Sequence, residues 1–194
     1  AILMAKLQPL AKKAFLFFKL TLIALFLLTA ISVKAQEKKT DQGKTATCSI
    51  EFTQKKDKLI ARVNISNDQP LAGLAIPLKY GNGKVPLQVD SVSFVKTRAE
   101  GFSYKPASFK ENFVLNDSLQ AVLIGLIAVT KPPLNKGEGP VAYIHFTIKD
   151  KKPFEVEIDT CRVYPNNSLQ LVDPEAQYVP VAFKKGKFKV NKSK

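Results

Sequence analysis

The sequence predicts an all-β protein, a β-sandwich of about nine strands preceded by an N-terminal signal peptide. Three observations carry this prediction. Apolar and polar residues alternate with period two from Thr45 onward. The twelve prolines and nine glycines mostly separate the alternating segments. An apolar fraction of 45% is sufficient for a packed core, which excludes a wholly disordered chain.

Residues 1–35 have the three parts of a secretory signal peptide. Lysines precede the apolar run LTLIALFLLTAI at 20–31, and Ser32–Ala35 ends in a V-x-A site before Gln36. The run is about 12 residues, short of the roughly 20 needed to span a bilayer. The alternative is an uncleaved anchor lengthened by Phe15–Phe18. We expect a secreted, periplasmic or cell-envelope protein that meets the membrane only through this signal.

The remaining chain divides into a flexible leader at 36–44, the sandwich domain at 45–190 and a basic tail at 191–194. The whole chain has 30 basic and 16 acidic residues, a net charge of +14. Unopposed lysines gather near the C-terminus at Lys184, Lys185, Lys187, Lys189, Lys192 and Lys194. They indicate either polyanion binding or, preferably for an exported chain, lysines that protect an edge strand from aggregation. Nucleic acid is not expected as a partner.

The first half of the domain predicts a hairpin and two further strands. Alternation at 48–53 and 59–66 flanks a turn at Lys55–Asp57. A strand follows at 71–80, where Pro77 indicates an edge position or a bulge. The next strand, at 85–95, changes phase at Asp90–Ser91, which predicts a bulge or a bend.

The second half predicts a central strand and several shorter ones. Residues 121–129 are apolar on both faces, as expected for a strand covered on each side. Residues 142–148 and 154–158 alternate, and short strands are expected near 168–172 and across the Lys-Gly-Lys segment at 185–187. The irregular segment 97–112 separates the two halves.

Four segments together resemble cohesin domains. They are Leu71–Tyr80, Val92–Phe94, Ala121–Val129 and Gly139–Ile148, whose order, spacing and polarity follow the cohesin pattern over residues 45–190. The resemblance implies a cohesin-like jelly-roll sandwich and a non-catalytic, secreted or envelope-associated interaction domain. Cohesins bind dockerins, and the wider structural group includes carbohydrate-binding modules. The resemblance therefore implies a protein partner, of the dockerin kind, or a polysaccharide.

The two cysteines, Cys48 and Cys161, lie near opposite ends of the domain. In an oxidising compartment such a pair is a candidate disulfide. Two buried free thiols are the alternative.

Residues for catalysis are scarce, so no enzyme activity, no catalytic residue, no cofactor and no metal ligand is assigned. The only histidine, His145, alternates with inward residues and is expected to face solvent. The stripe Glu155, Glu157 and Asp159 is expected to face solvent or to pair with lysines of a neighbouring strand. Structural calcium stays open at Asn67–Asp68, Asn116–Asp117 and Asp173 with Glu175, although turn formation explains these residues equally well.

Aromatic residues outside the strand cores are the candidate ligand contacts. Phe102 and Tyr104 lie in the irregular segment, and Tyr143 occupies an outward strand position. We expect either a protein partner at an exposed sheet face or at the 97–112 segment, or a carbohydrate-binding module that uses surface tyrosines. The competing interpretation is that these rings brace loops and cap the core.

Overall fold

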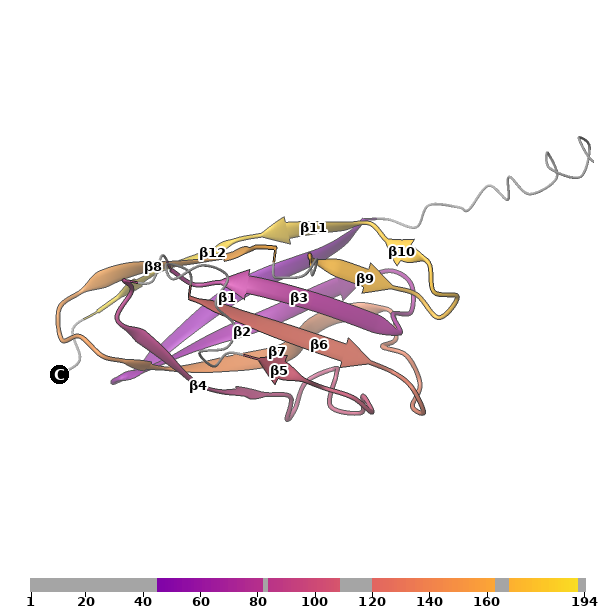
Figure 1. The fold of residues 1–194 in the computed structure, drawn as a ribbon, viewed down its shortest axis with the longest axis horizontal. Coiled ribbons are helices and arrows are strands. Elements are labelled where there is room, and N and C mark those ends of the chain that lie inside the picture. Colours follow the sequence, from indigo (N-terminus) through magenta and orange to yellow (C-terminus); the bar gives the residue numbers. More distant parts are fainter. Residues whose placement is uncertain (1–44, 82–83, 109–119, 163–167, 192–194) are drawn as a thin grey trace, which may run out of the picture. The chain divides into compact units, whose positions relative to one another are not determined.

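The computed structural model describes residues 45–81, 84–108, 120–162 and 168–191. These residues form twelve strands and no helix, arranged in two sheets (Figure 1). The predicted all-β sandwich is confirmed, and the excess over about nine strands comes mainly from two strands of two residues each. The predicted signal peptide and leader lie outside the described residues. Residues Gly43–Lys194 form one compact unit that contains every core residue from Ala46 to Val190.

One sheet has five strands in the order β11-β1-β2-β7-β4. Their bounds are Val181–Lys184 for β11, Ala46–Lys55 for β1, Lys58–Asn67 for β2, Gly137–Ile148 for β7 and Leu87–Ser93 for β4. The predicted hairpin is confirmed as β1 and β2, which pair from Thr47 opposite Ser66 to Lys55 opposite Lys58. The edge strand β11 joins β1 in parallel.

The other sheet has seven strands, of which five follow the order β10-β9-β3-β6-β5. Their bounds are Tyr178–Val179 for β10, Gln170–Val172 for β9, Gly73–Lys79 for β3, Ala121–Ile127 for β6 and Ala107–Ser108 for β5. The remaining two, β8 (Phe154–Thr160) and β12 (Gly186–Val190), pair with each other, and β8 also meets the end of β3.

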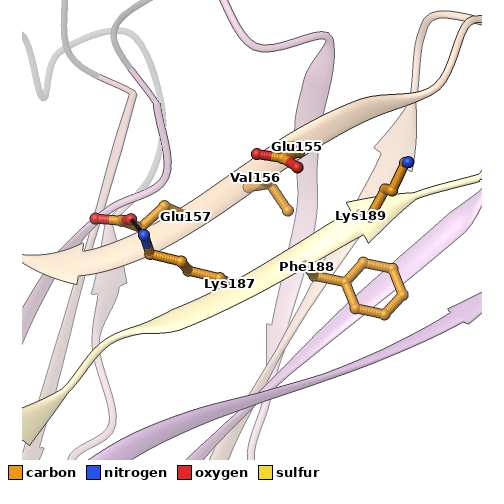
Figure 2. Close-up of a pocket in the computed structure, with 6 residues that line it drawn as sticks. All are labelled: Glu155, Val156, Glu157, Lys187, Phe188 and Lys189. Carbon is orange, nitrogen blue, oxygen red and sulfur yellow. Dashed lines mark ion pairs between the residues drawn. The ribbon is translucent and has the colours of Figure 1, made fainter.

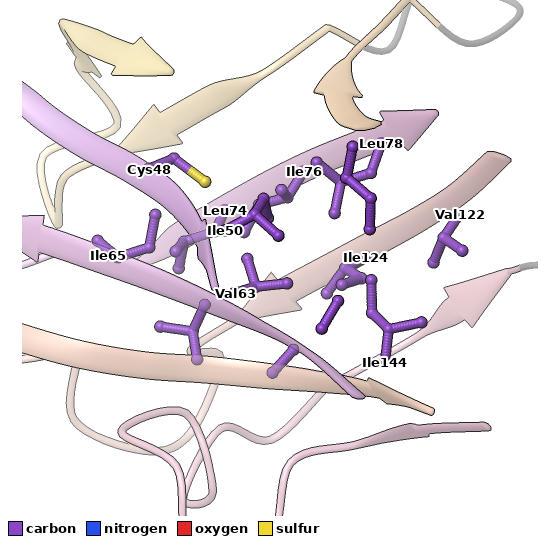
Figure 3. Close-up of a cluster of buried hydrophobic side chains, with 14 of the residues drawn as sticks. Cys48, Ile50, Val63, Ile65, Leu74, Ile76, Leu78, Val122, Ile124 and Ile144 are labelled. Carbon is purple, nitrogen blue, oxygen red and sulfur yellow. The ribbon is translucent and has the colours of Figure 1, made fainter. Parts of the chain in front are cut away.

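The core lies between the sheets and consists mainly of Ile, Val and Leu side chains from β1, β2 and β7 on one side and β3 and β6 on the other (Figure 3). Ile65, Ile76 and Ile124 are fully buried. Tyr80 caps this core with its ring edge against Phe146 at a centroid distance of 5.1 Å. Alternate side chains of each strand therefore lie in this core, and the side chains between them face outward.

The predicted bulge in β4 is confirmed, because the pairing of β4 with β7 shifts between Val89 and Ser91. A second shift, between Val63 and Asn64 of β2, was not predicted. Asn64 is buried there, and its side-chain oxygen has no hydrogen-bond partner among the described residues. The extra residue is Val141 of β7, because Asn64 pairs with Pro140 and Val63 with Ala142, and both Val141 and Ala142 are fully buried.

The expectation that Pro77 marks an edge strand or a bulge is wrong, because β3 lies in the interior of its sheet without a register shift. One side of β3 pairs with β6 along its whole length. On the other side the partner strand changes: β9 pairs with β3 as far as Ala75, and β8 pairs with β3 from Leu78 onward. The Pro77 carbonyl accepts from the Cys161 amide on that side, so its missing N–H falls where the partner strand changes.

The strand predicted at 121–129 is β6, and its inner face is confirmed as core. Val122, Ile124 and Leu126 are fully buried. The outer face is not covered to the same extent, because Leu123 is half-buried and Ile127 is 47% exposed. The chain near 185–187 also differs from the single strand predicted, because it passes from β11 in one sheet to β12 in the other.

That crossing requires a residue without a side chain. A Cβ on the buried Gly186 would lie 2.7 Å from a ring carbon of Phe52 and 2.8 Å from Cβ of Ile50. Such distances force the strand away from β1, which is costly in a packed core.

We predict that Gly186→Ala lowers the free energy of unfolding by about 1–3 kcal/mol because of this overpacking. Gly101→Ala is the matched control, because a Cβ there meets nothing within 4 Å. Its expected effect is below about 0.5 kcal/mol. Urea unfolding measures both, and equal stability of the two variants would contradict the packing argument.

Candidate functional site

The outer face of the seven-stranded sheet carries a cross-strand row of apolar residues. Residues directly opposite each other in neighbouring strands point to the same face of a sheet. The register places Tyr178 opposite Val172, Val172 opposite Gly73, and Gly73 opposite Ile127. Ile127 in turn forms an isolated bridge with Tyr104. We call these five residues the apolar row; it crosses β10, β9, β3 and β6 (Figure 1).

The floor beside the row is lined by small residues. The next outward positions are Gln170, Ala75 and Gly125, again directly opposite one another. Gly125 lies against Pro106, whose Cγ would be 3.1 Å from a Cβ at that position. The result is an open hollow of about 440 Å³ lined by residues of β3, β6, β9 and the turn that follows β9.

Large apolar side chains are exposed mainly along the apolar row. Five such residues are exposed in the part of the chain that the structure describes, and three belong to the row: Tyr104 at 56%, Ile127 at 47% and Tyr178 at 73%. Val129, at 69%, follows Ile127 by two residues, and Val95, at 61%, is not in the row. A concentration of exposed apolar surface of this kind is typical of an interaction site.

The segment 94–106 positions Tyr104. Phe102 is buried and belongs to the core, so the prediction that it contacts a ligand is wrong. Its ring instead anchors the segment two residues before Tyr104. The backbone of Tyr104 then exchanges hydrogen bonds of 3.3 and 3.0 Å with Ile127, which fixes the end of the row.

Arg98 holds the start of the same segment. Its guanidinium donates to the Ile65 carbonyl at 2.7 Å and to Oδ1 of Asn67 at 2.9 Å, and its backbone amide donates to the Pro140 carbonyl. Gly137 and Gly139 lie beneath it with φ of 145° and 142°, a conformation that favours glycine. Burial lowers the pKa of Arg98, while the charge of Glu138 opposes this effect. Sequence reasoning missed this cluster because its members are far apart in the chain.

A tight turn positions the opposite wall. The Asp173 carboxylate accepts from the amides of Glu175 at 3.0 Å and Gln177 at 2.8 Å, and Ala176 has φ of 60°. This turn leads directly into β10 and Tyr178. The interpretation of Asp173 as a turn former therefore explains its contacts.

The other open calcium candidates give no cluster either. Asn67 uses its side chain to bind the Gln69 and Asn135 carbonyls and to accept from Arg98. Asn116–Asp117 lies outside the described residues. Among the residues that are described, no group of three or more metal-ligating side chains occurs.

Tyr143 lies on the other sheet. It is half-buried on the outer face of the five-stranded sheet, opposite Arg62 of β2 and Ser93 of β4. The structure therefore separates Tyr104 from Tyr143, and no platform shared by both rings forms. His145 also lies on this outward side of β7, half-buried, as the alternation predicted.

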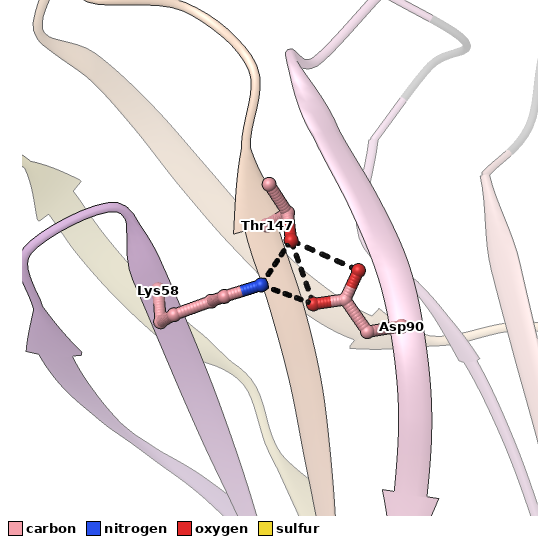
Figure 4. A network of polar contacts seen from close by, with 3 residues as sticks. All are labelled: Lys58, Asp90 and Thr147. Carbon is pink, nitrogen blue, oxygen red and sulfur yellow. Dashed lines mark hydrogen bonds and ion pairs between the residues drawn. The ribbon is translucent and has the colours of Figure 1, made fainter.

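The same face carries a polar network near the end of β7 (Figure 4). The Thr147 hydroxyl donates to the Asp90 carboxylate at 2.7 Å, and Lys58 approaches the same carboxylate at 3.0 Å. Desolvation opposes ionisation of Asp90, but the hydrogen bonds from Thr147 and Lys58 prevail and lower its pKa.

The predicted disulfide between Cys48 and Cys161 is not formed in the structure, where both are free thiols. Cys48 belongs to β1 of the five-stranded sheet and points into the core (Figure 3). Cys161 follows β8 of the other sheet and is half-buried. Burial raises the pKa of Cys48 to about 12, so this thiol stays protonated and unreactive near neutral pH.

The acidic stripe on β8 pairs with lysines, as one of the two sequence interpretations expected (Figure 2). Glu157 lies 2.9 Å from Lys185 and 3.0 Å from Lys187. Hydrogen bonds from these two lysines lower the pKa of Glu157. Glu155 stands directly opposite Lys189. The small hollow between β8 and β12 is thus lined largely by charges that compensate each other.

Comparisons with known proteins identify the fold. No family model and no curated protein matches the sequence. A cohesin ScaC of Acetivibrio cellulolyticus, solved with a ScaB dockerin, is similar over 76% of this chain and 99% of that one, with 13% identity and a TM-score of 0.58. The cohesin of a type I cohesin–dockerin complex of Clostridium thermocellum is similar over 76% of this chain and 94% of that one. The identity is 12% and the TM-score is 0.57.

A non-cellulosomal cohesin of the archaeon Archaeoglobus fulgidus is similar over 75% of this chain and 90% of that chain, with 15% identity and a TM-score of 0.51. The predicted cohesin-like jelly-roll sandwich is therefore confirmed as the fold. No helix within the described residues has the length and apolar character needed to cross a membrane.

We predict that Arg98→Ala lowers the free energy of unfolding by about 1–3 kcal/mol, because it leaves the buried Asn67 side chain and the Ile65 carbonyl without their donor. Arg162→Ala, at an exposed position, is the control and should change stability by less than about 0.5 kcal/mol. Chemical denaturation compares the two. If Arg98→Ala is as stable as Arg162→Ala, the guanidinium contacts contribute nothing to the fold.

A further prediction concerns how the stability contributed by Asp90 depends on pH. Because the pKa of Asp90 is lowered in the folded state, its contribution to stability is present above its ordinary pKa of 3.8 and is lost as pH falls through the lowered value. Asp90→Asn should therefore cost up to about 1 kcal/mol near pH 6. The difference from the wild type should disappear at a pH below the lowered pKa. Unfolding curves between these limits measure it, and a pH-independent difference would contradict the assignment.

Proposed function

We propose that this chain is an exported, non-catalytic binding domain that holds a protein partner on the apolar row. The single observation that carries the proposal is the row itself. Tyr178, Ile127 and Tyr104 expose large apolar surfaces in one line across the sheet, beside a floor of small residues. A soluble domain does not keep such a patch open without a use for it.

The dimensions of the hollow favour a helical element in the partner. Val172 and Ile127 stand on either side of Gly73 and are therefore two strand spacings apart, roughly 10 Å. An α-helix with its side chains is about 10–12 Å wide. Gly73, Ala75 and Gly125 leave the floor low, so a helix with small apolar residues can lie along β3 in close contact with the sheet.

The comparisons agree with this kind of partner. The similar domains of Acetivibrio cellulolyticus and Clostridium thermocellum are described in complexes with dockerins. We therefore propose a partner of the dockerin kind, in the sense of a separate protein domain that presents a helix. Export and a place in the cell envelope or outside it remain part of the proposal, based on the signal-like sequence at 1–35.

The carbohydrate alternative has no specific observation in its favour. Of its three proposed contacts, Phe102 is in the core, and Tyr104 and Tyr143 lie on different sheets. A sugar-binding platform made of two or more stacked rings is not assembled from these residues.

Site-specific photo-crosslinking tests the proposal. A photoreactive phenylalanine replaces Tyr178 in one variant and Tyr143, on the other sheet, in the control. In an envelope extract of the source organism, we expect a discrete protein adduct from position 178 and none from position 143. Equal labelling at both positions would contradict the proposed face.

The partner recovered in this way is then purified and titrated with two further variants. Ile127→Asp places a charge in the middle of the row and should weaken binding at least tenfold, since it buries an unpaired carboxylate at the interface. Val95→Asp is the control, because Val95 is also an exposed apolar residue, at 61%, but lies outside the row. Isothermal titration compares them, and an unchanged affinity for Ile127→Asp would rule out the row as the binding surface.

A further inference from the structure

One end of the sandwich is built from three neighbouring segments: the β1–β2 turn, the segment before β4 and the β7–β8 turn. The β1–β2 turn meets the end of β7, where the Ile148 amide donates to the Asp57 carbonyl at 2.8 Å. The next amide, of Lys149, donates to the Pro86 carbonyl, which brings in the segment before β4. Gln54 also bonds Asn191, directly after β12. The three turns therefore lie together at the end opposite the apolar row.

These turns are rich in exposed lysines. Six lysines share the end: Lys55, Lys56, Lys84, Lys149, Lys151 and Lys152. None of them forms an ion pair with a carboxylate of the described residues. Of the acidic groups in the same turns, Asp150 accepts a hydrogen bond from the Lys152 amide, and Asp57 is exposed. We call the six lysines the basic end.

The C-terminal lysines that the sequence analysis singled out do not belong to the basic end, and several of them lie opposite carboxylates of β8. Lys185 and Lys187 pair with Glu157, and Lys189 stands opposite Glu155. Lys58 is paired with Asp90. The structure thus pairs two of the C-terminal lysines with Glu157, whereas the six lysines of the basic end gather at one end without an ion pair to a described carboxylate.

The chemistry of the basic end favours a flat surface that carries many separate negative charges over a single small anion. The three arginines of the chain, Arg62, Arg98 and Arg162, lie elsewhere, so no planar guanidinium is available for bidentate recognition of one phosphate or carboxylate. Lysines act as hydrated point charges. They project from separate turns rather than along one groove that would follow a polymer.

We propose that the basic end binds an anionic lipid surface. Several turn tips at one end of an elongated domain can approach a flat layer of anionic headgroups together. Each lysine near such a surface strengthens binding about fivefold, which is about 1 kcal/mol. The strands then stand away from the membrane, and the apolar row at the far end stays open to a partner. This inference departs from the expectation that only the signal segment meets the membrane.

Vesicle sedimentation tests the proposal with residues 43–194, which contain the complete core and lack the apolar N-terminal run. The vesicles are phosphatidylcholine, either alone or with roughly one-third phosphatidylglycerol. At about 0.02 M salt we expect binding only to the mixed vesicles, and we expect it to be lost by about 0.3 M because exposed charges are then screened.

Matched charge reversals locate the surface. Lys151→Glu with Lys152→Glu should weaken binding at least about 25-fold, the product of two fivefold losses. Lys131→Glu with Lys136→Glu gives the same change in net charge at the opposite end and should stay within about threefold of the wild type. Equal losses in both variants would show that net charge alone acts and would overturn the proposal. So would binding to soluble inorganic polyphosphate without binding to the mixed vesicles.

Discussion

The alternation of inward and outward residues on β3 is the constraint on which the proposed binding face depends. Leu74, Ile76 and Leu78 are buried between the sheets, so Gly73, Ala75 and Pro77 must occupy the outward positions. Because β3 pairs on both sides, these small residues lie in the middle of the sheet rather than at its edge. The low floor of the hollow is therefore a direct consequence of the packing that forms the core.

This constraint also explains which parts of the fold could be predicted from sequence. The β1–β2 hairpin and the bulge at Asp90 are local patterns, since alternation and a change of its phase are visible within ten residues. The interior position of Pro77 was not predictable, because it depends on β9 giving way to β8 some 80 residues later. The bulge opposite Asn64 was missed, because its extra residue, Val141, comes just before the alternation recognised at 142–148.

The candidate site shows the same division. Tyr104 was identified from sequence as an exposed aromatic, but its neighbours in the row come from β6, β3, β9 and β10, which only the register brings together. Phe102 was misassigned because a ring in an irregular segment looks available for binding, whereas here it provides the buried anchor for the segment. Arg98 was overlooked for a related reason. One arginine in a polar segment gives no indication that it will meet Asn67 and two glycines of positive φ.

The two proposed surfaces, the basic end and the apolar row, differ in how strongly they depend on electrostatics. Where lysines and carboxylates face each other across β8 and β12, the register itself compensates the charge, so this strip has little reason to attract an anion. The six lysines of the basic end have no ion pair with a described carboxylate, so their positive charge persists. Binding of the proposed partner to the apolar row is instead expected to depend on shape and apolar contact, which salt hardly weakens. Salt should therefore release the basic end from a lipid surface while the row keeps its partner. Variants at either surface should not affect binding at the other, because no described contact links the turns of the basic end to the residues of the row.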